Sequence, residues 1–140
     1  MRVVFDTNIL VAAARSKQGA SFALLSMLPT KHFELALSVS LYTEWQAVMS
    51  RPENLPPETV AEDALAFLRY LTSLAHLQDV FYLWRPRLKD SDDDMVLECA
   101  VAAGCSYIVT HNVRDFAGID SLGVEAIRPA DFLDLIRSAS

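Results

Sequence analysis

Short apolar runs alternate along the chain with longer segments whose apolar positions have helical spacing. The apolar runs are rich in β-branched and aromatic residues and end in polar ones, which predicts buried strands. The predicted strands cover residues 3–5, 33–39, 80–84, 107–109 and 124–127. The predicted helices cover residues 9–14, 21–28, 41–49, 58–76, 95–103 and 129–138. This alternation predicts the α/β class, with a central parallel sheet of about five strands flanked by helices on both faces.

Individual residues mark the ends of several predicted helices. Ser40 is expected to cap the helix over residues 41–49. Gly104 follows another helix at a position that favours glycine, and Pro129 is expected to open the last one. A segment with three prolines, residues 51–57, is the clearest linker, but it is too short to separate domains.

Length and composition narrow the class of protein further. A chain of 140 residues has enough apolar surface for one core, so we expect a single domain over residues 1–140. With 52% hydrophobic and 21% charged residues, global disorder is excluded. The apolar runs are too short for a membrane span, and Asp6 interrupts the apolar start that a signal peptide would need. Cys99 and Cys105 fit neither a disulfide framework nor a zinc site, so we expect reduced thiols and a cytoplasmic protein.

Polar side chains follow two of the predicted strands, at the edge where open parallel sheets bind ligands. The residues at these two strand ends are Asp6, Thr7 and Asn8, and Thr110, Asn112 and Asp115. Two further acids are expected near helix N-termini: Glu44 in the first turn of its helix, and Asp94 opening the helix before the fourth strand. Acids at such positions also interact favourably with the helix dipole, so the position of Glu44 and Asp94 does not by itself indicate a function.

A cleft that gathers four carboxylates needs a cation, because like charges repel strongly at short range. The candidate ligands are Asp6, Glu44, Asp94 and Asp115. A site made only of oxygen donors suits Mg²⁺ or Mn²⁺. An EF-hand is excluded, because Met95 and Val101 stand where that loop needs Gly and Glu. Phosphate-binding glycine loops and the HExxH and GxSxG motifs are absent from the sequence.

The ordered set of motifs resembles a PIN domain, and in particular the VapC-like toxins of toxin–antitoxin pairs. The resemblance rests on Asp6-Thr7-Asn8 after the first strand, Glu44 in a helix, Asp94 before a helix that ends at Gly104, and the segment THNVRDF after the next strand. It covers essentially the whole chain. It implies a metal-dependent endoribonuclease with a parallel sheet and an acidic cleft.

The resemblance also implies roles for individual residues. Mg²⁺ or Mn²⁺ would be bound by the four acids named above, which would carry the catalysis, supported by Thr7, Asn8, Thr110 and Asn112. Asp94 is taken as the third acid because it stands ten residues before Gly104 and leads into the apolar helix face, but Asp93 or Asp92 can take its place. The implied reaction is hydrolysis of an RNA phosphodiester.

The charge of the chain is compatible with an RNA substrate only if the acids are neutralised. A net charge of −6 argues against a general basic nucleic-acid surface. Without the four site carboxylates the charge is −2, and two divalent ions would offset those four charges. Candidate phosphate contacts at the rim are Arg85, Arg87, Lys89 and Arg114.

The resemblance implies two protein partners. One is a small cognate antitoxin that packs on an apolar surface and blocks the cleft, and the other is a second copy of the chain in a homodimer. No membrane partner is expected. Two alternatives remain open: a PIN nuclease that processes RNA without being a toxin, and a catalytically silent binding module. The second is disfavoured because all four acids are present.

Overall fold

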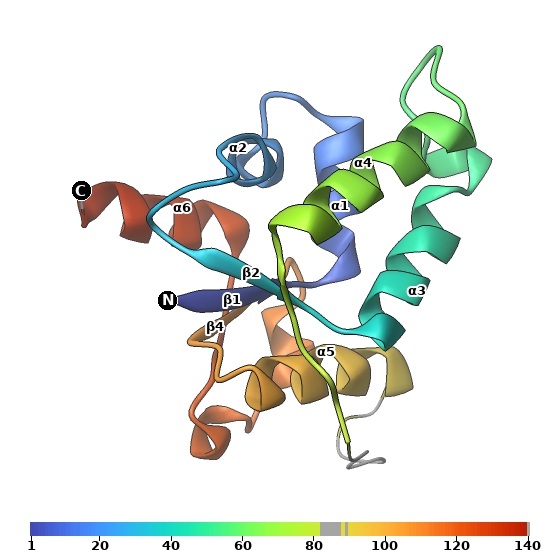
Figure 1. Ribbon diagram of the computed structural model, residues 1–140. Coiled ribbons are helices and arrows are strands. Elements are labelled where there is room, and N and C mark those ends of the chain that lie inside the picture. Colours follow the sequence, from blue (N-terminus) through green and yellow to red (C-terminus); the bar gives the residue numbers. More distant parts are fainter. Residues whose placement is uncertain (82–87, 89, 140) are drawn as a thin grey trace.

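A computed structural model shows one twisted sheet with helices on both faces (Figure 1). The structure describes residues 1–81, 88 and 90–139. Within them all neighbouring strands are parallel, in the order β3-β2-β1-β4-β5. The strands are β1 (Arg2–Phe5), β2 (Glu34–Leu37), β3 (His76–Leu77), β4 (Tyr107–Val109) and β5 (Glu125–Ile127). The predicted α/β class and five-stranded parallel sheet are confirmed.

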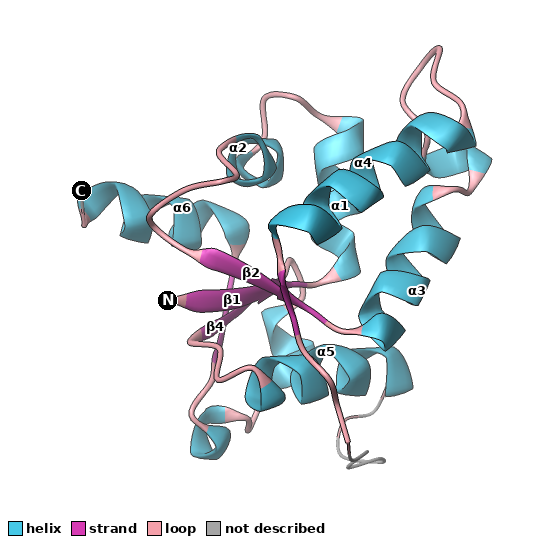
Figure 2. Ribbon diagram, in the orientation of Figure 1, coloured by secondary structure: helices cyan, strands magenta, loops and turns pink. Residues whose placement is uncertain are grey.

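The helices form a layer on each side of the sheet (Figure 2). They are α1 (Thr7–Arg15), α2 (Ala20–Ser26), α3 (Val39–Met49), α4 (Ala61–Leu74), α5 (Ser91–Ala102) and α6 (Pro129–Ser138). Helices α1, α2 and α4 lie on one face, where α6 packs against α2, and α5 lies on the other face. Helix α3 contacts α1 and α4 as well as α5, so it closes the end of the sandwich.

The sheet core follows from the apolar runs of the sequence. In β1, every residue after Arg2 is fully buried, as expected of a central strand covered on both faces. Phe33 lies between two other rings, with centroids 5.8 Å from Phe5 and 5.3 Å from Phe132. Tyr107 of β4 contacts Phe132 at 5.8 Å. These rings connect the strands to α6 through edge-to-face and tilted contacts, which favour one orientation of α6 on the sheet.

The strand order creates a switch point between β1 and β4. From β1 the chain builds outward to β2 and β3, and then returns to place β4 on the other side of β1. Helix α1 leaves β1 on one face, whereas α5 reaches β4 from the other. Connections that diverge in this way leave a crevice at the carboxyl ends of the two strands, where open α/β sheets bind ligands. Asp6 and Thr110 are the first residues beyond these two ends.

Helix α3 begins two residues earlier than its sequence suggests. Its N-cap is Ser38, whose hydroxyl accepts a hydrogen bond from the amide of Leu41 at 3.2 Å; the expected cap, Ser40, lies inside the helix. Ser38 and Ser40 both stand shortly before Leu41 and are equally good N-cap residues, so the sequence alone does not show which of them caps the helix. As a result Glu44 lies in the second turn, beyond the reach of the strongest dipole effect.

The acidic residues before the helix predicted over 95–103 are themselves the cap and first turn of α5. Its N-cap is Asp90, whose carboxylate accepts from the amide of Asp92 at 2.9 Å, and Asp94 does not open the helix. Four acids within five residues suggest a solvated loop, but carboxylates in a first turn also satisfy free amides and interact favourably with the helix dipole.

The third strand is also displaced from its expected position. The predicted strand at 80–84 lies partly outside the described residues, and its described part, Val80 and Phe81, is not a strand. Instead β3 follows α4 at His76–Leu77, where the range expected to be helical ends. It pairs with Ala36 and Leu37 of β2, and such long-range pairing leaves no local mark in a two-residue strand.

Within the described part of the chain, the helices are too short or too polar to cross a lipid bilayer.

Gly104 makes the turn from α5 into β4 and should be sensitive to substitution. Its φ is +66°, and no atom lies within 4 Å of the place a Cβ would take, so a side chain meets backbone strain but no clash. Gly104→Ala should therefore lower the free energy of unfolding by about 1 kcal/mol. Gly104→Asn should lower it by less, because Asn tolerates the left-handed region. Urea unfolding measures both variants, and equal losses would contradict this account.

Candidate active site

Asp6 stands at the centre of the crevice and is held by hydrogen bonds from three residues. Its Oδ1 accepts from the amide of Thr7 at 2.8 Å, and its Oδ2 accepts from the Thr110 hydroxyl at 2.8 Å and from the Asn8 amide at 3.3 Å. Burial raises the pKa of this carboxyl, the bonds from Thr110 and Thr7 lower it, and the charges of Asp115 and Asp90 raise it again. The site therefore orients a carboxylate that is costly to ionise.

The loops after β1 and β4 are tied together around Asp6. The Asn8 amide also contacts the Thr110 hydroxyl at 3.3 Å, and its carbonyl oxygen accepts from the His111 amide at 3.3 Å. The Thr110 hydroxyl in turn accepts from the Asn112 amide at 3.0 Å. The two polar motifs that follow the strands in sequence are thus one network in space.

Glu44 reaches the same crevice from α3. Burial raises its pKa, as do the charges of Asp92, Asp6 and Asp90, whereas the Thr7 hydroxyl lowers it. That hydroxyl is buried and, among the described residues, has no partner in full hydrogen-bond geometry. An unpartnered buried hydroxyl beside acids is one more oxygen donor that a bound cation would satisfy.

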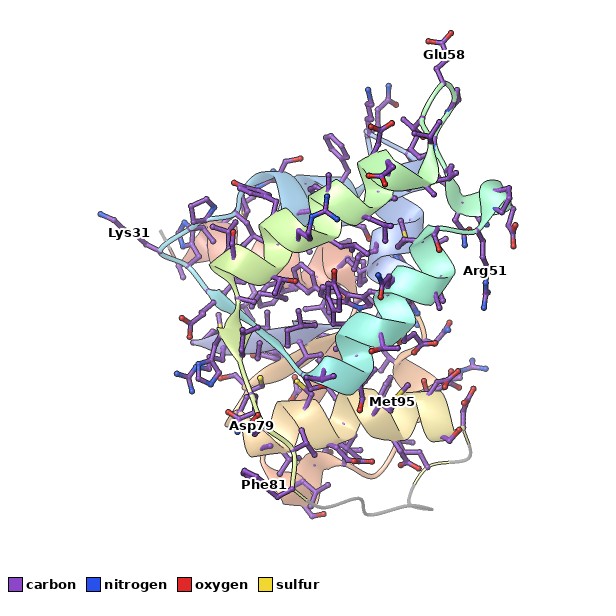
Figure 3. The ribbon with its side chains drawn as sticks, turned by 45° about the vertical axis from the view of Figure 1, so that its right-hand side comes forward. Lys31, Arg51, Glu58, Asp79, Phe81 and Met95 are labelled. Atoms are coloured by element: carbon purple, nitrogen blue, oxygen red, sulfur yellow. The ribbon has the colours of Figure 1, made fainter. Side chains whose placement is uncertain are left out.

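Asp93, in the first turn of α5, faces these acids. Helix α5 lies against α3 near Met95 (Figure 3). Burial raises the pKa of Asp93 to about 7, with further contributions from Asp6, Asp90, Asp115 and Asp92. A carboxyl whose pKa is raised by several converging acids marks the most repulsive point of the cluster.

Asp94 has a different environment from Asp93. It is 2% exposed, and its Oδ1 accepts from the amide of Leu88 at 2.9 Å. The structure thus brings Asp93 to the cluster and holds Asp94 against the preceding loop.

Asp115 completes the cluster from the short 3-10 helix Val113–Phe116. It is exposed, and its charge acts on both Asp6 and Asp93. Arg114 lies on the same rim and is exposed. The remaining predicted RNA contacts, Arg85, Arg87 and Lys89, lie outside the described residues.

Asp90 is a contributor that the sequence did not single out. As the N-cap of α5 it raises the pKa of Asp6, Glu44 and Asp93. Its place within the run of acids was visible, but its orientation depends on where the helix begins.

The donors of the cluster fit a hard divalent cation. They are carboxylate and hydroxyl oxygens, which such cations prefer. Among the described residues no three acidic, His or Cys side chains are close enough to form a ready-made metal cage. Mg²⁺ does not need one, because it usually keeps several waters and binds through one or two carboxylates.

Comparison with known proteins agrees with the fold. A PIN-domain model matches residues 2–114, a range that includes Asp6, Glu44 and Asp93 and ends one residue before Asp115. The chain belongs to the PIN-domain family, a family of nucleases. No curated protein matches it in sequence.

Two solved structures share the fold. One is a chain of VapBC2 from Rickettsia felis, bound to a DNA fragment from their promoter, with 17% identity, a TM-score of 0.61, and coverage of 91% of this chain and 98% of that one. The other is a chain of VapBC-1 from nontypeable Haemophilus influenzae, with 17% identity, a TM-score of 0.64, and coverage of 93% and 99%.

Replacing Asp93 should stabilise the protein at high pH. Because the folded pKa is about 7, above the ordinary 3.8, the folded state holds this proton more tightly and loses that stabilisation as pH rises toward 7. Asp93→Asn should therefore be more stable than wild type at pH 8, by about 1 kcal/mol after solvent screening, and no more stable at pH 4. Thermal or urea unfolding at both pH values measures this.

Asp131 offers a matched control for that substitution. It is the third residue of α6, as Asp93 is of α5, and it is not among the acids that raise the cluster pKa values. Asp131→Asn should leave stability unchanged or slightly lower at both pH values, since it loses only a dipole interaction. An equal gain from both variants would mean that the cluster does not repel.

Proposed function

We propose that this chain is a metal-dependent endoribonuclease that hydrolyses RNA phosphodiester bonds and serves as the toxin of a toxin–antitoxin pair. The observation that carries the proposal is the cluster of Asp6, Glu44, Asp93 and Asp115 at the switch point of a PIN-domain sheet, where burial and the charges of neighbouring acids raise the pKa values of Asp6, Glu44 and Asp93. Asp93 replaces the expected Asp94 in this proposal, because Asp93 faces the other acids.

Each residue has a distinct task in this proposal. The four acids would hold Mg²⁺ or Mn²⁺, with Thr7 adding a hydroxyl oxygen to the site. The cation supplies charge neutralisation at the scissile phosphate and acidifies the attacking water. The remaining proposed supports of the site keep the acids in place: Thr110 and Asn8 fix both the position and the ionised form of Asp6, and Asn112 helps to orient Thr110.

An apolar groove supports the proposed antitoxin partner. It encloses about 380 Å³ between α1, α2 and α4. The apolar side chains that line it are Leu10, Ala13, Ala14, Phe22, Leu25, Met49, Pro56, Ala64 and Phe67. A groove of this composition fits the apolar face of an amphipathic helix. The solved structures that share the fold are VapBC toxin–antitoxin complexes, which supports an antitoxin as the occupant.

Two further parts of the proposal concern assembly and location. Exposed Leu77 and Phe81 at the open edge of the sheet support a homodimer, which size-exclusion chromatography would measure. Free, buried Cys99 and Cys105 support a reducing compartment such as the cytoplasm.

The nuclease proposal predicts metal-dependent cleavage of RNA by the pure protein. With Mg²⁺ or Mn²⁺, wild type should cleave a total RNA preparation, and excess chelator should abolish the reaction. Asp6→Asn and Asp93→Asn should each lower the rate at least about 100-fold, because each removes a proposed cation ligand. Asp131→Asn should keep wild-type activity. Undiminished cleavage in chelator, or by Asp6→Asn, would refute the proposal.

The antitoxin proposal predicts that one exposed ring on α4 controls complex formation. Phe67 lines the groove and is 42% exposed, whereas Tyr70, on the same helix and 49% exposed, does not line it. On co-expression with the protein encoded next to it, Phe67→Ser should weaken the complex about 10-fold or more, while Tyr70→Ser should not. Co-purification measures both, and equal effects would show that the partner does not use the groove.

A further inference from the structure

A hollow lies beside the acidic cluster, one strand further along the sheet. Its volume is about 360 Å³, and it is lined by residues 111–115 and by Arg128. Residues 111–115 follow β4, whereas Arg128 directly follows β5 and is the N-cap of α6. Since β4 and β5 are parallel neighbours, both walls of the hollow come from the same edge of the sheet as Asp6.

The two arginines that line this hollow keep their charge available. In the described part of the chain, neither Arg114 nor Arg128 has an ion pair or a side-chain hydrogen bond; the ion pair seen there joins Arg2 to Glu34.

The lining selects an oxyanion as the ligand. Arg114 and Arg128 present planar forks of N–H donors, which match phosphate oxygens better than a point charge does. The side-chain amide of Asn112 adds a donor, and Asp115 is the one carboxylate of the lining. Asp115 also acts electrostatically on Asp6 and Asp93, so the hollow adjoins the acids.

We propose that the hollow between Arg114 and Arg128 is a subsite for one backbone phosphate of the RNA, next to the phosphate that is cleaved. This inference rests on the proposed nuclease function and deepens it. The acids bind the scissile phosphate through a cation, whereas the arginines bind its neighbour directly. Because phosphate contacts position a nucleic acid without reading its sequence, the subsite sets the register of the strand on the sheet edge.

The test measures RNA binding and catalysis separately. Binding of a fluorescein-labelled single-stranded oligoribonucleotide is followed by anisotropy in Mg²⁺, with Asp6→Asn in every protein to prevent cleavage. The variants are Arg114→Gln, Arg128→Gln and the double variant. Lys31→Gln is the control, since it removes the same charge from the segment before β2, at the opposite edge, where Lys31 projects away from the molecule (Figure 3). The rate constant kcat is measured for the same substitutions without Asp6→Asn.

Each arginine variant should raise Kd about 10-fold, whereas Lys31→Gln should not change it. If both arginines bind one phosphate, the slope of log Kd against log salt should fall by about 0.7 in total in the double variant, and by less in each single variant, because the remaining arginine still neutralises that phosphate. The value of kcat at saturating RNA should stay within about twofold, and Arg128→Lys should recover part of the affinity.

Other outcomes overturn the subsite. Arginine variants that bind like Lys31→Gln, or that lose kcat without losing affinity, would contradict it, as would a double variant whose salt slope falls by about 1.4, the value for two separate phosphates. Melting temperatures within about 2 °C of the parent protein show that the variants are folded. If wild type does not cleave RNA, the nuclease proposal fails, while the Kd values still decide the subsite.

Discussion

The mutual repulsion of carboxylates held at one edge of the sheet is the constraint on which the rest of this molecule depends. The parallel pairing of β1 with β4 brings Asp6 and Thr110 together, and the Thr110 hydroxyl holds Asp6 at 2.8 Å. Asp93 and Glu44 approach from two different helices, and burial together with the charge of Asp6 raises the pKa of each. A fully packed core behind β1 prevents this edge from relaxing, so the repulsion favours a bound proton or, as we propose, a bound cation.

Helix α1 connects the site with the face that we propose for a partner. Its N-terminus carries Asp6 and Thr7 at the crevice, while Leu10, Ala13 and Ala14 of the same helix line the apolar groove. The groove and the crevice therefore share one rigid element, although they suit ligands of opposite character. A partner seated in the groove lies within one or two helical turns of the acids, a short distance for a chain segment that also covers the crevice.

Much of the site was predictable because its residues follow directly from strand ends. Asp6, Asn8 and Thr110 come immediately after buried apolar runs, and a parallel sheet aligns such ends whatever the details of packing. The choice between Asp93 and Asp94 was not predictable in this way. Adjacent helical residues point about 100° apart, so the choice depends on the exact start of α5 and on the side that packs against the sheet. Arg128 was missed for a similar reason, since only the pairing of β5 with β4 brings it beside Arg114.

The sequence by itself determined the class, the alternation of strands and helices, and the presence of oxygen-bearing side chains at two strand ends, because apolar periodicity and abrupt polar stops are local properties. Tertiary structure decided the remainder. It moved the third strand to His76–Leu77, turned the acidic run into the first turn of a helix, and directed Asp93 toward Asp6 while Asp94 accepts from Leu88. These outcomes depend on register and on helix rotation, which are fixed by contacts between segments far apart in the chain and are therefore invisible to any local reading.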